Sequence, residues 1–119
     1  MFPEFVFTAQ VWVYQGDSPW HFVTLPPDVS SQIREATAED RKAFGTLKVA
    51  ASIGGTRWKT SIFWSNHSAG NPSNKPGCFY MPVKAAVRQR EQLHGGLTVE
   101  VVVEVLPATA SHAKMKKLQ

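Results

Sequence analysis

The feature that most restricts the fold of this chain is a pair of glycines between two segments whose side chains alternate between two faces. Side chains suited to a buried face fall at every second position around Gly54-Gly55: Leu47, Val49, Ala51 and Ile53 before it, and Trp58, Thr60, Ile62 and Trp64 after it. Such alternation is typical of a strand with one buried face. Two glycines supply the positive-φ positions of a tight turn. The sequence therefore predicts an antiparallel hairpin here.

Four other segments have the character of strands. Residues 5–14 alternate at period two, whereas residues 20–25 and 78–81 are short and rich in β-forming side chains. In residues 97–106 valines alternate with other side chains, so one face is expected in the core and the other in water. We expect Val99, Val101, Val103 and Val105 inside, and Glu100 and Glu104 outside.

Two short helices are expected, each after a strand that ends at a proline. The first begins at Asp28, a residue type that caps helices, and its apolar face consists of Val29, Ile33 and Ala36. The second ends at Gly95-Gly96, and its apolar face consists of Val83, Ala86 and Val87.

The order of these elements is β, β, α, β in each half of the chain. Leu25-Pro26 and Met81-Pro82 occupy matching places, as do Gly45 and Gly96. Several strands are apolar on both faces, which makes open sheet edges unfavourable. The sequence therefore predicts a mainly β fold, a small closed or partly open six-stranded β-barrel with two short helices and a pseudo-two-fold ββαβ repeat. An open α+β sheet is the alternative.

The residues that carry a family resemblance are spread along the chain: Pro19-Trp20, Phe22, Val23, Leu25-Pro26, Phe44-Gly45, Val49, Ile53-Gly54-Gly55, Trp58, Thr60, Ser61, Phe63, Tyr80, Met81, Pro82, Val83-Lys84, Ala86-Val87-Arg88 and Gly95-Gly96. In this order they resemble the domain-of-unknown-function family DUF1905, small and mostly bacterial and archaeal barrels sometimes found beside YdeI/OmpD-associated domains. The resemblance runs from Phe7 to Val105 and implies a six-stranded barrel without an assigned activity. The stretch from Tyr80 to Val99 is also similar to the strand–helix–strand of swapped-hairpin transition-state regulators, which bind DNA as dimers.

The composition fits one cytoplasmic domain. With 119 residues, 43% of them hydrophobic and 18% charged, the chain has enough apolar side chain for one core. No apolar run approaches the ~20 residues of a membrane span, and the N-terminus up to Tyr14 has no Lys or Arg, unlike a secretory signal. Cys78 is the only cysteine, so no intrachain disulfide forms, as expected in a reducing compartment.

The positive charge is concentrated at the C-terminus. The chain has a net charge of +4, but residues 1–106 hold 10 Lys or Arg and 9 Asp or Glu, a balance of +1. Residues 107–119 add Lys114, Lys116 and Lys117 without an acid. We therefore expect a single β-barrel domain at 1–106 and a basic, disordered tail at 107–119.

No catalytic or metal-binding motif is visible. The histidines His21, His67, His94 and His112 have no partner at metal-ligand spacing, and no Gly-x-Ser-x-Gly sequence is present. Cys78 has no local partner that would activate it as a nucleophile. We expect no cofactor and no metal.

Two sets of residues are candidates for binding. Lys84, Arg88 and Arg90, with Lys75, form a local basic patch for an anion, unless they are an ordinary solvated face. Trp12 beside Tyr14 is a candidate for a groove or partner interface, with core packing as the alternative. The sequence thus favours a non-enzymatic binding or accessory module for an unidentified small ligand or protein. Nucleic-acid or other anion binding through Lys84, Arg88, Arg90 and the tail is the alternative, and an enzyme of unknown reaction the third hypothesis.

Overall fold

The computed structural model describes residues 4–14, 16, 19–38, 46–65 and 77–106. Within these ranges the chain forms seven strands, β1 (Glu4–Gln10), β2 (Trp12–Tyr14), β3 (Trp20–Thr24), β4 (Thr46–Ile53), β5 (Thr56–Ser65), β6 (Cys78–Pro82) and β7 (Thr98–Val105), and two helices, α1 (Pro27–Ala36) and α2 (Ala85–Glu91). The strands form one sheet in the order β1-β7-β4-β5-β6-β3-β2, with every neighbouring pair antiparallel. The C-terminal tail expected at 107–119 lies outside the described residues.

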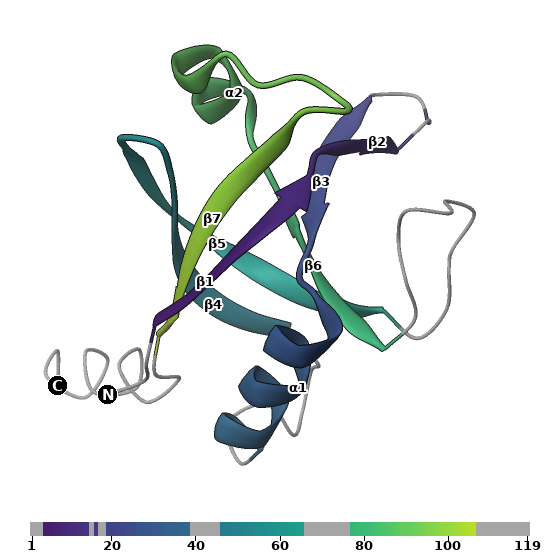
Figure 1. Ribbon diagram of the computed structural model, residues 1–119, viewed down its shortest axis with the longest axis vertical. Coiled ribbons are helices and arrows are strands. Elements are labelled where there is room, and N and C mark those ends of the chain that lie inside the picture. The colour runs from purple at the N-terminus through teal and green to yellow at the C-terminus, as the bar shows by residue number, and fades with distance from the viewer. Residues whose placement is uncertain (1–3, 15, 17–18, 39–45, 66–76, 107–119) are drawn as a thin grey trace, which may run out of the picture.

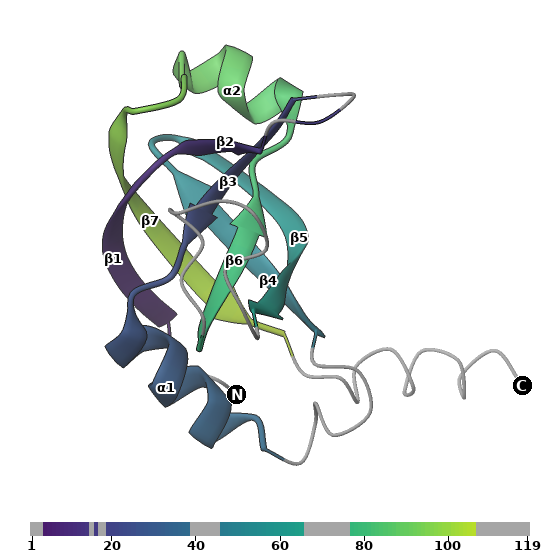
Figure 2. The same ribbon diagram turned by 90° about the vertical axis from the view of Figure 1, so that its right-hand side faces the viewer.

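The sheet is a partly open barrel because its first strand bends. β1 pairs with β7 at one edge of the sheet and β2 pairs with β3 at the other, so consecutive pieces of one segment form both edges (Figure 2). At the bend, the N–H of Val11 donates to the carbonyl of Leu97 at 2.8 Å, and the carbonyl of Val11 accepts from the N–H of Gly96 at 2.7 Å. We expected one strand over residues 5–14. The bend divides it, which gives seven strands in place of six.

The expected ββαβ repeat is present in the pairing of the strands. When β1 and β2 are taken as one bent strand, exchanging the two halves of the chain turns the pairing β1–β7 into β5–β4 and the pairing β2–β3 into β5–β6. The pairings β3–β6 and β4–β7 are converted into themselves. The fold is therefore mainly β with pseudo-two-fold topology, as the sequence predicts.

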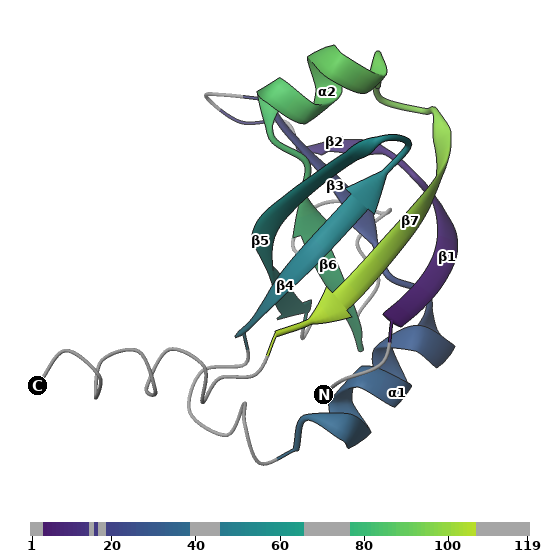
Figure 3. The ribbon, with the colours of Figure 1, turned by 90° about the vertical axis from the view of Figure 1, so that its left-hand side faces the viewer.

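The core lies inside the curled sheet and follows the period-two pattern. β1, β7, β4 and β5 lie side by side along one wall (Figure 3). Val101, Val103 and Val105 are buried and Val99 packs against the core, while Glu100 is exposed and Glu104 is half-buried. On the outer face, Nη2 of Arg57 donates to Oε1 of Glu104 at 2.8 Å and forms an ion pair with it. The expected orientation of this strand is confirmed.

The two helices cover opposite ends of the barrel (Figure 1). Helix α1 has Pro26 at its N-cap and no capping side chain, so the expectation that Asp28 caps it is wrong. Pro27 occupies the first helical position instead, where a proline is favoured because its φ is fixed near the helical value and its missing N–H would have no partner within the helix. The buried face of α1 contains Ser30 with Val29 and Ile33, whereas Ala36 is exposed. No helix among the described residues is long and apolar enough to cross a membrane.

Helix α2 ends earlier than its glycines suggest. Gln92 is the C-cap in the left-handed conformation at φ 56°, and its N–H donates to the carbonyl of Arg88. Ala86, expected on the apolar face, is exposed. Gly95 is needed for a close approach, because a Cβ there would lie 2.8 Å from Cγ2 of Val13. The glycine pair therefore serves the contact with the bent first strand instead of ending the helix.

The β4–β5 hairpin closes with the pair Ile53 and Thr56, as expected from Gly54-Gly55. Only Gly54 has a positive φ, at +60°, so the expectation of two positive-φ positions is wrong. The carboxylate of Glu91 from α2 lies over Gly54 and accepts a 2.6 Å hydrogen bond from the hydroxyl of Thr56. The turn therefore anchors the end of α2.

Replacing Gly54 by alanine is expected to lower the free energy of unfolding by about 1–2 kcal/mol, the cost of a left-handed conformation for a residue with a Cβ. The new Cβ would also overlap the Glu91 carboxylate. Gly55→Ala is the matched control, because its φ is not positive and its Cβ would meet no atom within 4 Å. Urea unfolding of both variants measures the difference, and equal stabilities would contradict this account of the turn.

Candidate functional site

Aromatic side chains gather on the outer face of β2, β3, β6 and β5, away from the core. Outward positions alternate with buried ones, so that Phe22 and Tyr80 point away from the core side of their strands. The strand register sets the outward residues in three parallel rows. The central row consists of Trp12, Phe22 and Pro82. On one side of it lies the row of Thr24, Tyr80 and Phe63, and on the other side lies the pair of Tyr14 and Trp20.

The rings contact one another across these rows. Trp12 stacks on Phe22 with ring centroids 4.9 Å apart, and Phe22 meets Tyr80 edge-on at 5.4 Å. Trp20 is nearly parallel to Phe22, with 16° between the ring planes and 6.4 Å between centroids. The indole N–H of Trp12 donates to Oγ1 of Thr24 at 2.8 Å, which fixes the orientation of that ring.

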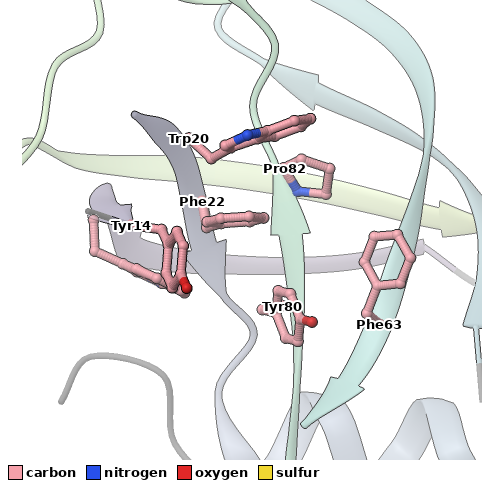
Figure 4. Close-up of a pocket in the computed structure, with 7 residues that line it drawn as sticks. Tyr14, Trp20, Phe22, Phe63, Tyr80 and Pro82 are labelled. Carbon is pink, nitrogen blue, oxygen red and sulfur yellow. The ribbon is translucent and has the colours of Figure 1, made fainter. Parts of the chain in front are cut away.

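These side chains line a groove of about 420 Å³, which we call the aromatic groove; its residues are Trp12, Tyr14, Trp20, Phe22, Phe63, Tyr80 and Pro82 (Figure 4). Trp20 and Tyr14 are 57% and 44% exposed, whereas Trp12 is only 8% exposed. Apolar pockets of roughly 300–1,000 Å³ are the usual size for small-molecule ligands. The groove can therefore hold a flat or apolar group.

Sequence reasoning found only part of this groove. Trp12 and Tyr14 both line it, and Trp12 is in addition packed, because the bend at Val11 turns it against Phe22. The sequence alone predicts no groove role for the other five lining residues. Their alternation with buried neighbours was a usable signal for an outer face, as in Trp20, Phe22 and Thr24 on either side of the buried Val23.

A second groove, of about 340 Å³, adjoins the aromatic groove and shares Trp20 and Pro82 with it. We call it the basic groove. Its charged and titratable lining residues are Lys59 of β5, Lys84 before α2, Arg88 of α2 and His21 of β3, with no acid among the residues that line it. The remainder of the lining is Pro19, Trp58, Thr60, Val83 and Ala85. An acid-free set of cations is suited to an anionic group.

The guanidinium of Arg88 is held in place from one side. Its Nε–H donates to the carbonyl of Val83 at 3.2 Å, and the N–H of Val83 in turn donates to the carbonyl of His21 at 2.8 Å. No residue in the described part of the chain accepts from the terminal nitrogens of Arg88. A guanidinium anchored through Nε can still offer these nitrogens to an anion as two parallel donors.

A family model of a domain of unknown function, DUF1905, matches residues 7–103. The chain belongs to this family. No curated protein matches the chain. The DUF1905 match contains every residue that lines the aromatic and basic grooves.

In this DUF1905 domain, the pKa of His21 is lowered, so His21 adds little positive charge to the basic groove at neutral pH. Burial lowers the pKa of His21 below its ordinary value, the nearby Arg88 guanidinium acts in the same direction, and a backbone hydrogen bond with Pro19 opposes both. The Nδ1 atom is buried without a hydrogen-bond partner among the described residues. The cations that face an anion in this groove are therefore Lys59, Lys84 and Arg88.

The basic patch expected from the sequence is only partly brought together. Lys84 and Arg88 share the basic groove, with Lys59 as a third cation that sequence reasoning did not select. Arg90 is exposed on α2 and is not among the lining residues. Lys75 lies outside the described residues. Lys59 is far from Lys84 in sequence, so only the packing of β5 beside β6 and α2 brings them to one groove.

The other side chains with catalytic or metal-binding potential do not form a cluster among the described residues. Cys78 is buried on β6 as a free thiol. His94 is exposed and its Nδ1 lies 2.9 Å from the carbonyl of Gly95. Across the part of the chain that the structure describes, no three His, Cys, Asp or Glu residues are grouped as metal ligands would be. His67 and His112 lie outside that part.

Proposed function

We propose that this DUF1905 domain is a non-enzymatic, cytoplasmic binding module whose ligand has a flat or apolar part and an anionic group. The observation that carries the proposal is that the two grooves share Trp20 and Pro82 as lining residues. The aromatic groove takes the apolar part of the ligand and the basic groove takes the anion.

The aromatic groove lies outside the main core cluster. Trp12, Phe22 and Tyr80 are absent from the core cluster, which lies on the opposite face of the same strands. Exposed aromatic surface of this kind lowers solubility and marks interaction sites in soluble proteins. Its extent over four strands therefore favours a binding role.

The lining of the aromatic groove favours binding over catalysis. Apart from the phenols of Tyr14 and Tyr80 it contains no titratable side chain, so it offers no carboxylate, imidazole, amine or thiol for general acid and base catalysis. The basic groove contains a neutral histidine beside cations, without a carboxylate to orient it. These linings support recognition of a ligand and not a reaction on it.

Titration with anilinonaphthalene sulfonate tests the proposal, because this probe combines a flat aromatic body with a sulfonate. We expect its fluorescence to rise on binding and Trp20→Ala to weaken that binding about tenfold, which corresponds to ~1.4 kcal/mol for the loss of one wall of the groove.

Val6→Ala is the matched control, since Val6 is exposed to the same extent, 57%, on β1 outside both grooves. It is expected to leave the affinity unchanged. The proposal fails if the unmodified protein does not bind the probe, or if Trp20→Ala and Val6→Ala bind it equally well.

A further inference from the structure

We infer that the ligand of the two grooves is single-stranded nucleic acid, with a base against Trp20 in the aromatic groove and phosphates on Lys59, Lys84 and Arg88. This inference rests on the proposed function and names its ligand class. No residue lining either groove is acidic, so nothing in the lining opposes a polyanion.

The position of Trp20 connects the two kinds of contact. Its ring is 57% exposed, lies nearly parallel to Phe22 and lines both grooves. Because Trp20 lines both grooves, a base stacked on its ring and the phosphate of the same nucleotide can each contact one of them. Stacking of a base on an aromatic side chain contributes about 1–3 kcal/mol and tolerates any sequence.

Three cations from two parts of the chain supply the charge. Lys59 comes from β5, Lys84 precedes α2 and Arg88 lies within α2. The Nε–H of Arg88 is bound to the carbonyl of Val83, which orders the guanidinium before a phosphate arrives. Arginine grips a phosphate with two parallel hydrogen bonds whereas lysine offers a point charge. We therefore expect Arg88→Ala to weaken binding more than Lys84→Ala.

A single strand fits these grooves better than a duplex. The faces of paired bases are covered by their neighbours in a duplex, so the rings of the aromatic groove have nothing to stack on. Duplex binding then depends on phosphate contacts alone. The barrel is poorly suited to that, since residues 1–106 carry a net charge of only +1.

The test is fluorescence anisotropy of the full chain with four probes: a labelled single strand of about eight nucleotides, the duplex of the same sequence, an abasic single strand of the same length, and a mononucleotide as competitor. We expect micromolar binding of the single strand and at least tenfold weaker binding of the duplex and the abasic strand. The affinity is expected to fall about 100-fold per decade of salt, because each of three neutralised phosphates contributes a slope of about 0.7.

Variants of equal charge separate the groove from the rest of the surface. Lys84→Ala with Arg88→Ala is expected to weaken single-strand binding more than tenfold and to reduce the salt slope by about 1.4. Lys48→Ala with Arg90→Ala removes the same charge from exposed positions that line neither groove, and is expected to change the affinity by less than about threefold. Thermal unfolding of each variant confirms that the barrel is intact.

Each other result overturns the inference. Equal losses in the two double variants, or equal binding of the abasic strand, would mean that charge alone attracts the strand. Competition by the mononucleotide at the concentration of the oligonucleotide would identify a free nucleotide as the ligand. If anilinonaphthalene sulfonate still binds in a Trp20-dependent manner while no oligonucleotide does, the ligand class is wrong and the binding module stands; if neither binds, both fail.

Discussion

Replacing Phe79 by alanine is expected to lower the free energy of unfolding by about 3–5 kcal/mol. Phe79 is fully buried at 0% exposure on β6, and its ring meets Trp64 edge-on with 5.0 Å between centroids. The backbone around the cavity that the ring would leave is fixed on both sides, because the carbonyl of Phe79 accepts from the N–H of Leu25 at 2.9 Å and its N–H donates to Oγ of Ser30 at 3.0 Å. The site cannot collapse freely, so the cost falls in the upper part of the usual range.

Phe63→Ala is the control for this prediction, because it removes the same side chain from the neighbouring strand. Phe63 is half-buried in the aromatic groove, outside the core cluster. We expect it to cost less than half as much stability as Phe79→Ala and, unlike Phe79→Ala, to weaken probe binding in the folded protein. Urea unfolding and the sulfonate titration measure the two effects. Similar losses of stability would mean that the aromatic groove is part of the core.

Replacing Ser30 by alanine is expected to cost about 2 kcal/mol, within the range of about 1–3 kcal/mol for a buried polar group left without its partner. The hydroxyl of Ser30 is fully buried; it donates to the carbonyl of Leu25 at 3.2 Å and accepts from the N–H of Phe79 at 3.0 Å. It therefore joins the start of α1 to β6. Alanine leaves the Phe79 N–H in the core without this acceptor.

Ser31→Ala is the matched control for Ser30, since Ser31 is the next residue of the same helix and is exposed. Alanine is the better helix former, so we expect a neutral effect or a gain of up to ~0.5 kcal/mol. In thermal unfolding we therefore expect Ser30→Ala to lower the melting temperature, and Ser31→Ala to leave it unchanged or raise it slightly. Equal melting temperatures would refute a structural role for the Ser30 hydroxyl.

The strands could be predicted from the sequence because the alternation of side chains that identifies a strand lies within its own residues. The valines of β7 and the alternating residues around Gly54-Gly55 determine which face of each strand is apolar, and burial of that face is the dominant gain on folding. Local patterns predicted the ends of the helices less well. Gln92 ends α2 in a left-handed conformation that glycine normally takes, and Gly95 is reserved for the approach of Val13.

The candidate site could be predicted only where a single segment carries it. Trp12 and Tyr14 lie two residues apart on one strand, and Lys84 and Arg88 one helical turn apart, so their proximity is local. Phe63 reaches Tyr80 because β5 pairs with β6 in a register that sets these two residues opposite each other. Nothing in either segment alone specifies that register.

The sequence by itself thus determined the mainly β class, the ββαβ repeat and the inward faces, because alternation and turn-forming residues act over a few positions. Only the tertiary structure decided that the outer faces of β2, β3, β6 and β5 join into one aromatic groove, that Lys59 reaches the cations of α2, and that Ser30 is buried. These features depend on which strands become neighbours when the bend at Val11 carries the first strand to both edges of the sheet. Pairing over long sequence separations is set by the total burial of the closed core, which no local segment encodes.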